Sequence, residues 1–72
     1  MRGLMIVRIE DASIFVGLSS DDARTQIVGR GYTPRFVWAD GNTLVADYKP
    51  DYDPLRVNLH IEKNRVIKAT IG

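Results

Sequence analysis

Residues 56–62 alternate strictly between polar and apolar side chains, and this pattern constrains the fold more than any other feature of the sequence. An extended chain places the apolar members on one face: Val57, Leu59 and Ile61. The polar members share the other face: Arg56, Asn58, His60 and Glu62. Lys63-Asn64 follows as a tight turn, and residues 65–71 return as the last strand. The second half of the chain therefore predicts a β-hairpin with one face on a core.

A short helix is predicted to begin after Ser19, whose hydroxyl can accept from a backbone N–H of the first turn. Two acidic residues suit the positive end of the helix dipole: Asp21 and Asp22. Residues 24–26 are expected to face solvent. Three apolar residues are expected to form or flank the buried face: Ala23, Ile27 and Val28. Two glycines end the helix: Gly29 and Gly31.

Two further strands are indicated by apolar and β-branched content, over residues 3–9 and 35–39. Phe36 and Trp38 are two residues apart, so we expect both on the same face, directed into the core against the helix or the loop. An exposed Trp38 would instead indicate a partner surface. Asp40-Gly41 is a turn signal, and residues 40–55, interrupted by prolines, are predicted to form a long loop.

The chain of 72 residues has room for one domain, 1–72, with an N-terminal strand extension over 1–12 and a core over 13–72. The element order predicts an α+β fold, in which one helix packs on a small mixed β-sheet that carries a long exposed binding loop. There are no cysteines, and the apolar run at residues 4–7 is too short for a signal peptide. A cytoplasmic protein is the expectation.

Charge and residue content argue against several functions. The formal net charge is +1 with no basic stripe, so neither nucleic acid nor a membrane is an expected partner. One histidine, no cysteine, no Ser-His-Asp spacing and no phosphate-binding glycine loop predict that the protein is not an enzyme. No metal or cofactor is expected, because one histidine and scattered aspartates offer no closed ligand set.

The order strand, helix, strand, long loop, strand, strand resembles that of the potato inhibitor I family. Phe15-Val16-Gly17 followed by Ser19, Ala23 and Ile27 resembles the family's entry into its helix. Residues 51–61 are similar to the acidic-aromatic-x-Pro-x-Arg-x-Asn segment of its small bacterial and fungal branch, and Ile71-Gly72 to its ending.

The resemblance implies an inhibitor of subtilisin-like or chymotrypsin-like serine proteases that acts through a rigid, substrate-like loop over about 43–54. The loop residues expected to bind the protease are Leu44, Val45, Ala46, Asp47, Tyr48, Lys49, Pro50, Asp51 and Tyr52. Arg56 matches the arginine that supports the family's loop, with Asp47 or Asp51 as its acidic partner, and Asn58 matches the asparagine of the branch. His60 shares their face and is a candidate for making binding pH-dependent.

The loop is longer than the family pattern, which leaves two placements for the scissile bond. If the extra residues are 52–55, the bond is Ala46-Asp47; if they lie earlier, it is Pro50-Asp51. Proline fits a deep specificity pocket badly, which favours Ala46, although Val45 then replaces a common threonine. The alternative function is a non-inhibitory interaction module of the same fold, including a factor of viral or mobile-element origin.

Overall fold

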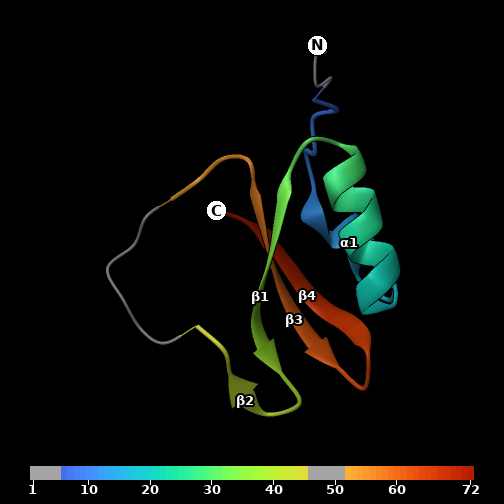
Figure 1. The fold of residues 1–72 in the computed structure, drawn as a ribbon, viewed down its shortest axis with the longest axis vertical. Helices are drawn as coiled ribbons and strands as arrows, with labels where there is room; N and C mark the ends of the chain where they lie inside the picture. The colour runs from blue at the N-terminus through green and yellow to red at the C-terminus, as the bar shows by residue number, and fades with distance from the viewer. Residues whose placement is uncertain (1–5, 46–51) are drawn as a thin grey trace.

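The computed structural model describes residues 6–45 and 52–72, and in them one helix covers one face of a four-stranded mixed sheet (Figure 1). A 3-10 helix, η1 (Ala12–Phe15), precedes the α-helix α1 (Ser20–Gly29). The strands are β1 (Thr33–Ala39), β2 (Asn42–Thr43), β3 (Arg56–Glu62) and β4 (Arg65–Ile71). Their order is β2-β1-β3-β4, with β1 and β3 parallel and the other pairs antiparallel. The predicted α+β class is confirmed.

Both hairpin turns have a left-handed backbone, and three of their four central residues, all but Lys63, are of types that tolerate it. Asp40 and Gly41 have φ values of 50° and 87°, and Lys63 and Asn64 have 51° and 64°. Positive φ at both central positions matches the right-handed twist of the flanking strands. The backbone N–H of Lys63 also donates to Asp40 Oδ1 at 2.8 Å, which joins the two turns at one end of the sheet.

The helix begins and ends where the sequence predicted. Ser19 Oγ accepts from the Asp22 N–H at 3.1 Å, and beyond the last helical residue Gly31 adopts a φ of 84°. Ala23 and Ile27 are fully buried, and Val28 flanks this buried face with 53% of its side chain exposed. Successive helical residues point about 100° apart, so the neighbour of a central core residue faces sideways.

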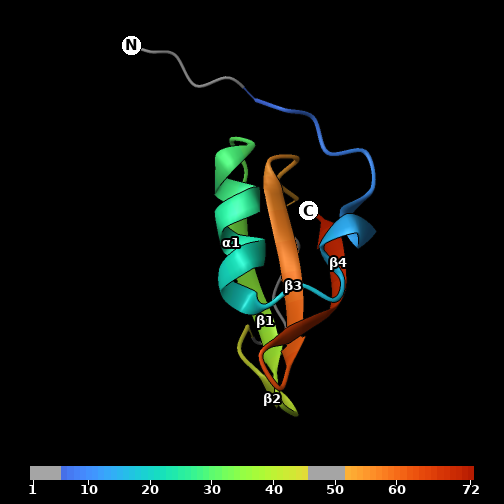
Figure 2. The ribbon, with the colours of Figure 1, turned by 90° about the vertical axis from the view of Figure 1, so that its right-hand side faces the viewer.

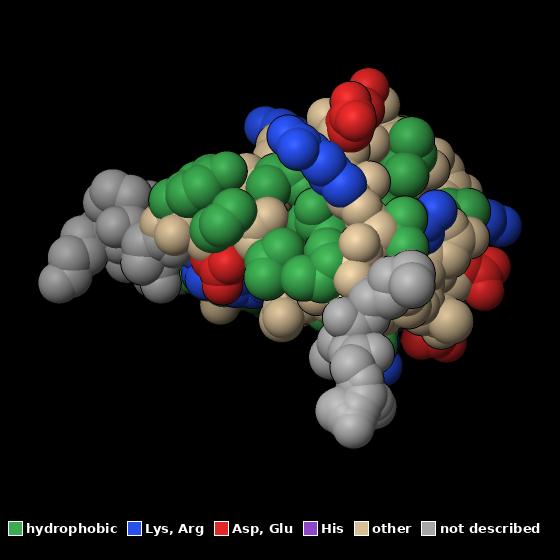
Figure 3. Space-filling view, turned by 90° about the horizontal axis from the view of Figure 1, so that it is seen from above, with side chains coloured by type: hydrophobic (Ala, Val, Ile, Leu, Met, Phe, Trp, Pro, Cys, Tyr) green, Lys and Arg blue, Asp and Glu red, His purple; other side chains and the backbone are tan. Residues whose placement is uncertain are grey.

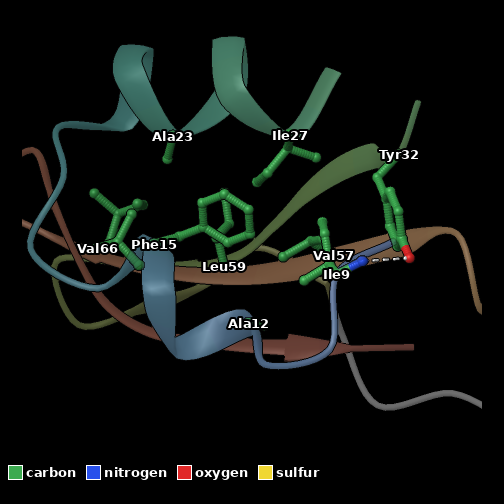
Figure 4. Packing of buried hydrophobic residues seen from close by; sticks show 10 residues of the cluster. Ile9, Ala12, Phe15, Ala23, Ile27, Tyr32, Val57, Leu59 and Val66 are labelled. Atoms are coloured by element: carbon green, nitrogen blue, oxygen red, sulfur yellow. Dashed lines mark hydrogen bonds between the residues drawn. The ribbon is translucent and has the colours of Figure 1, made fainter. Parts of the chain in front are cut away.

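The core lies between α1, η1 and the sheet (Figure 4). Ala12 and Phe15 of η1 enter it beside the two buried helix residues. The sheet contributes the predicted apolar face of β3, Val57, Leu59 and Ile61, and Val66 of β4. Tyr32 closes one end, and its hydroxyl accepts from the Ile9 N–H at 3.0 Å.

The predicted N-terminal strand was wrong for the residues that the structure describes. Residues 6–9 form no ladder, and η1 begins at Ala12; the rest of the predicted strand, 3–5, lies outside the described residues. The Val7 N–H donates to the Arg30 carbonyl at 3.0 Å, and Ile9 is held by Tyr32. This segment therefore passes the end of α1 and adds no strand to the sheet (Figure 2).

A β-bulge in β1 corrects the prediction that Phe36 and Trp38 share a face. Phe36 pairs with Leu59 and Trp38 with His60, and the register shifts between them, so Val37 is the extra residue. Phe36 packs against the core, whereas the Trp38 ring lies 6.2 Å from the His60 ring. The bulge thus moves Trp38 to the face of the sheet opposite α1.

Candidate functional site

The connection between β1 and β3 is the predicted functional loop, and its first end is fixed at the bulge. The N–H groups of Leu44 and Val45 both donate to the Val37 carbonyl, at 2.9 and 3.4 Å. Thr43 belongs to β2, a short strand that sequence analysis assigned to the loop. The extra residue of β1 therefore anchors the start of the connection.

The second end of the connection is held by a turn and by the neighbouring strand. Asp53 Oδ1 accepts from the Leu55 N–H at 2.9 Å, and the Asp53 carbonyl accepts from the Arg56 N–H at 3.1 Å. The Leu55 carbonyl accepts from the Thr33 N–H at 2.8 Å. The chain thus enters β3 through a local turn already bonded to β1.

Arg56 and Gly72 form the polar centre of this end. The Gly72 backbone oxygen accepts from Arg56 Nε at 3.2 Å, from Arg56 Nη2 at 2.6 Å and from the Asp53 N–H at 3.3 Å. The Gly72 N–H in turn donates to the Arg56 carbonyl at 2.9 Å. One oxygen therefore joins the end of β4, the start of β3 and the loop, and two of its three donors come from a charged guanidinium.

Tyr52 packs on Gly72. The φ of Gly72 is 133°, and a Cβ built there would lie 3.2 Å from the Tyr52 ring and 3.8 Å from Asn58 Nδ2. Only glycine suits both the backbone conformation and this close approach. Tyr52 nevertheless stays 71% exposed, so most of its ring is available to solvent or to a partner.

The face of the sheet opposite α1 brings the predicted support residues together with two that sequence analysis missed. Asn58 Oδ1 accepts from Arg35 Nε at 3.0 Å, and His60 lies against Trp38. Burial lowers the pKa of His60 below its ordinary value of 6.5, and the nearby charge of Lys68 lowers it further. Arg35 and Trp38 join this row because the parallel pairing and the bulge set them opposite Asn58 and His60.

Acidification is expected to destabilise the domain through His60. Its pKa is lower in the folded state, so the unfolded chain binds more protons below pH 6.5, and the free energy of unfolding falls as the pH drops through that window. Above pH 6.5 this contribution is complete. NMR titration of the single histidine, with urea unfolding at several pH values, checks the result; H60Q should flatten this pH dependence, and an ordinary or raised pKa would contradict it.

The structure places only part of the predicted protease-binding loop. Leu44 is 53% exposed and Val45 is half-buried, and both lie at the first end of the connection. The residues between the two ends lie outside the described part: Ala46, Asp47, Tyr48, Lys49, Pro50 and Asp51. Both placements of the scissile bond, and the predicted acidic partner of Arg56, therefore remain predictions.

The described residues contain no pocket, no group of three or more side chains able to hold a metal ion, and no helix long and apolar enough to cross a membrane. Comparison with protein-family models, with curated proteins and with solved structures gave no match. The two anchored ends of the connection are the features of the described residues that bear on function.

Proposed function

We propose that the protein inhibits a serine protease through the connection between β1 and β3. The observation that carries the proposal is that both ends of this connection are bonded to one sheet, at Val37 on one side and at Gly72 and Thr33 on the other. A peptide held at both ends has less conformational entropy to lose in a protease cleft, and the saving appears as affinity. The chain has no cysteine, so this support has to come from hydrogen bonds.

The residues divide between contact and support in this proposal. Leu44, Val45 and Tyr52 border the bound segment, and Ala46 or Pro50 supplies the residue before the scissile bond. Arg56 supports the second end of the loop by donating to the Gly72 oxygen. Asn58 positions Arg35 on the same face of the sheet by accepting from its Nε. Subtilisin-like or chymotrypsin-like enzymes are the proposed targets, and a cytoplasmic location stays a prediction from the sequence.

Titration of subtilisin and of elastase with the purified protein tests the proposal. We expect stoichiometric inhibition with slow cleavage at one bond, which mass spectrometry would place after Ala46 or after Pro50. The matched control replaces residues 46–51 with a glycine-serine segment of equal length, which should leave the fold intact and remove inhibition. Rapid degradation of the protein, or no binding at micromolar concentration, would contradict it.

A non-inhibitory interaction module is the second candidate, and exposed apolar side chains near the loop favour it. Tyr52 and Leu44 are 71% and 53% exposed, and Leu55 is 38% exposed. Figure 3 shows hydrophobic side chains on the end of the molecule where α1 stops. Val28, in the last turn of α1, is 53% exposed. Capture of a non-protease protein by the wild type, lost in the glycine-serine variant, would favour this function.

A further inference from the structure

The outer edge of β4 makes no backbone hydrogen bond over its second half within the described residues, although η1 packs against this strand. β4 is the last strand in the order β2-β1-β3-β4. Within the described residues, no strand pairs with the side of β4 that faces away from β3. Near its start this side is covered, because Val66 exchanges hydrogen bonds with Gly17 and Leu18, at 2.8 and 2.9 Å. No described backbone group bonds to this side beyond Val66, and Thr70 is exposed.

The direction of each backbone group along this edge follows from the ladder with β3. Gly72 donates inward to Arg56, and backbone groups in a strand alternate from side to side. Thr70, paired with Asn58, therefore also faces β3, whereas the N–H and C=O groups of Ala69 and Ile71 point outward. Two donors and two acceptors thus stand in a row on the open edge.

The opposite edge of the sheet is protected. There β2 covers the end of β1, and the Thr33 N–H bonds toward β3, so the next residue, Pro34, faces outward. Proline has no N–H to offer a passing strand and is a usual protection of such edges. Residues 69–71 are thus a stretch of the described sheet edge with outward donors and acceptors and neither a covering strand nor a proline.

We infer that this edge binds the same edge of a second copy of the chain in an antiparallel pair. Two strands related by a two-fold axis through Thr70 place Ala69 of one copy opposite Ile71 of the other. Outward-facing residues then meet outward-facing residues, and the pair forms four N–H···O=C bonds. The two sheets become one continuous sheet of eight strands.

The side chains fit this register. Thr70 meets Thr70 of the second copy at the axis, a β-branched pair that stabilises antiparallel strands. Lys68 falls opposite Gly72 of the other copy, so no like charges face each other along the pair. A formal net charge of +1 gives two copies little mutual repulsion. A strand pair this short buries less area than most stable dimers, so we expect dissociation constants in the micromolar to millimolar range.

Analytical ultracentrifugation of the whole chain at concentrations up to about 1 mM tests the inference. We expect a monomer–dimer equilibrium that T70D and T70K each weaken about tenfold at low salt, because like charges then meet at the axis. An equimolar mixture of the two variants should restore association, since aspartate then faces lysine. T43D is the matched control: Thr43 is also exposed and lies on the other edge, and this variant should associate like the wild type.

Amide hydrogen exchange of the wild type gives a second test that needs no variant. Exchange at Ala69 and Ile71 should slow as the protein concentration rises, whereas exchange at Asn42 on the other edge should not change. A monomer at about 1 mM, association unaffected by both Thr70 variants, or exchange at Ala69 and Ile71 independent of concentration would each overturn the inference. If the protein stayed a monomer at about 1 mM and still inhibited a protease, the inference would fail while the proposed function stood.

Discussion

Replacing Phe15 with alanine is expected to lower the free energy of unfolding by about 3–5 kcal/mol. Phe15 is the largest of the fully buried side chains, and it lies in the core where η1 meets α1 and the sheet. Its removal loses the transfer free energy of the ring and leaves a cavity that the short η1 cannot fill. At the usual stability per residue, a domain of 72 residues has about 4–11 kcal/mol in all, so this loss takes a large share.

Urea unfolding followed by circular dichroism measures the effect, and the adjacent Ile14 supplies the control. Ile14 is also in η1 but is 54% exposed, so I14A should cost less than about 1 kcal/mol. If F15A and I14A were equally stable, the packing of η1 against the sheet would be wrong.

Replacing Arg56 with alanine is expected to have its largest effect on the loop. The guanidinium donates twice to the Gly72 oxygen. A hydrogen bond to a charged group contributes about 1.5–3 kcal/mol at best. Because Arg56 is partly exposed, we expect the two bonds together to stabilise the fold by about 2 kcal/mol. The same oxygen accepts from Asp53, so its release loosens the second end of the connection. Inhibition should weaken at least tenfold, and cleavage within residues 44–55 should accelerate by a similar factor.

Inhibition constants, loop cleavage rates and urea unfolding separate this effect from a general loss of charge. Arg8 is the matched control, because it is exposed and bonds to no described residue, so R8A removes the same charge with little consequence. Equal loop cleavage rates in R56A and R8A would show that Arg56 does not support the loop. Loss of loop support with unchanged inhibition would instead count against the proposed protease contact.

The bounds of β3 and β4 were predictable because the sequence pattern that sets them is local. Strict alternation over residues 56–62 predicted the buried face, and Lys63-Asn64 forms the turn with positive φ at both positions. The helix start was equally local, since Ser19 caps it through a residue three positions along. The sequence of each of these segments sufficed without knowledge of its partners.

The errors lie where distant segments decide the structure. Alternation placed Phe36 and Trp38 on one face, but the bulge at Val37 exists in the pairing with β3 and in bonds to Leu44 and Val45. The apolar residues 6–9 looked like a strand, yet they pack against the end of α1, which periodicity cannot reveal. Both errors come from tertiary contacts that override a local pattern.

In the candidate site, too, features set by the local sequence were predictable and features set by distant segments were not. Arg56 and Asn58 were placed correctly on one face by two-residue periodicity, but the acceptor of Arg56 in the described structure is the backbone of Gly72, which has no side-chain signal. The turn at Asp53 could have been found, because an aspartate before proline commonly accepts from the backbone two residues on. Arg35 became visible only when the parallel register set it opposite Asn58.

The parallel pairing of β1 with β3 bears on how the domain folds and how far it can be engineered. Thr33 pairs with Arg56 across the whole connection, so this ladder is the non-local step, and we expect the β3–β4 hairpin to form before it. The free-energy cost of closing the connection grows only with the logarithm of its length, by about 0.6 kcal/mol for each doubling. Foreign peptides much longer than the natural segment could therefore be grafted between Val45 and Tyr52, with folding slowed more than stability is lost.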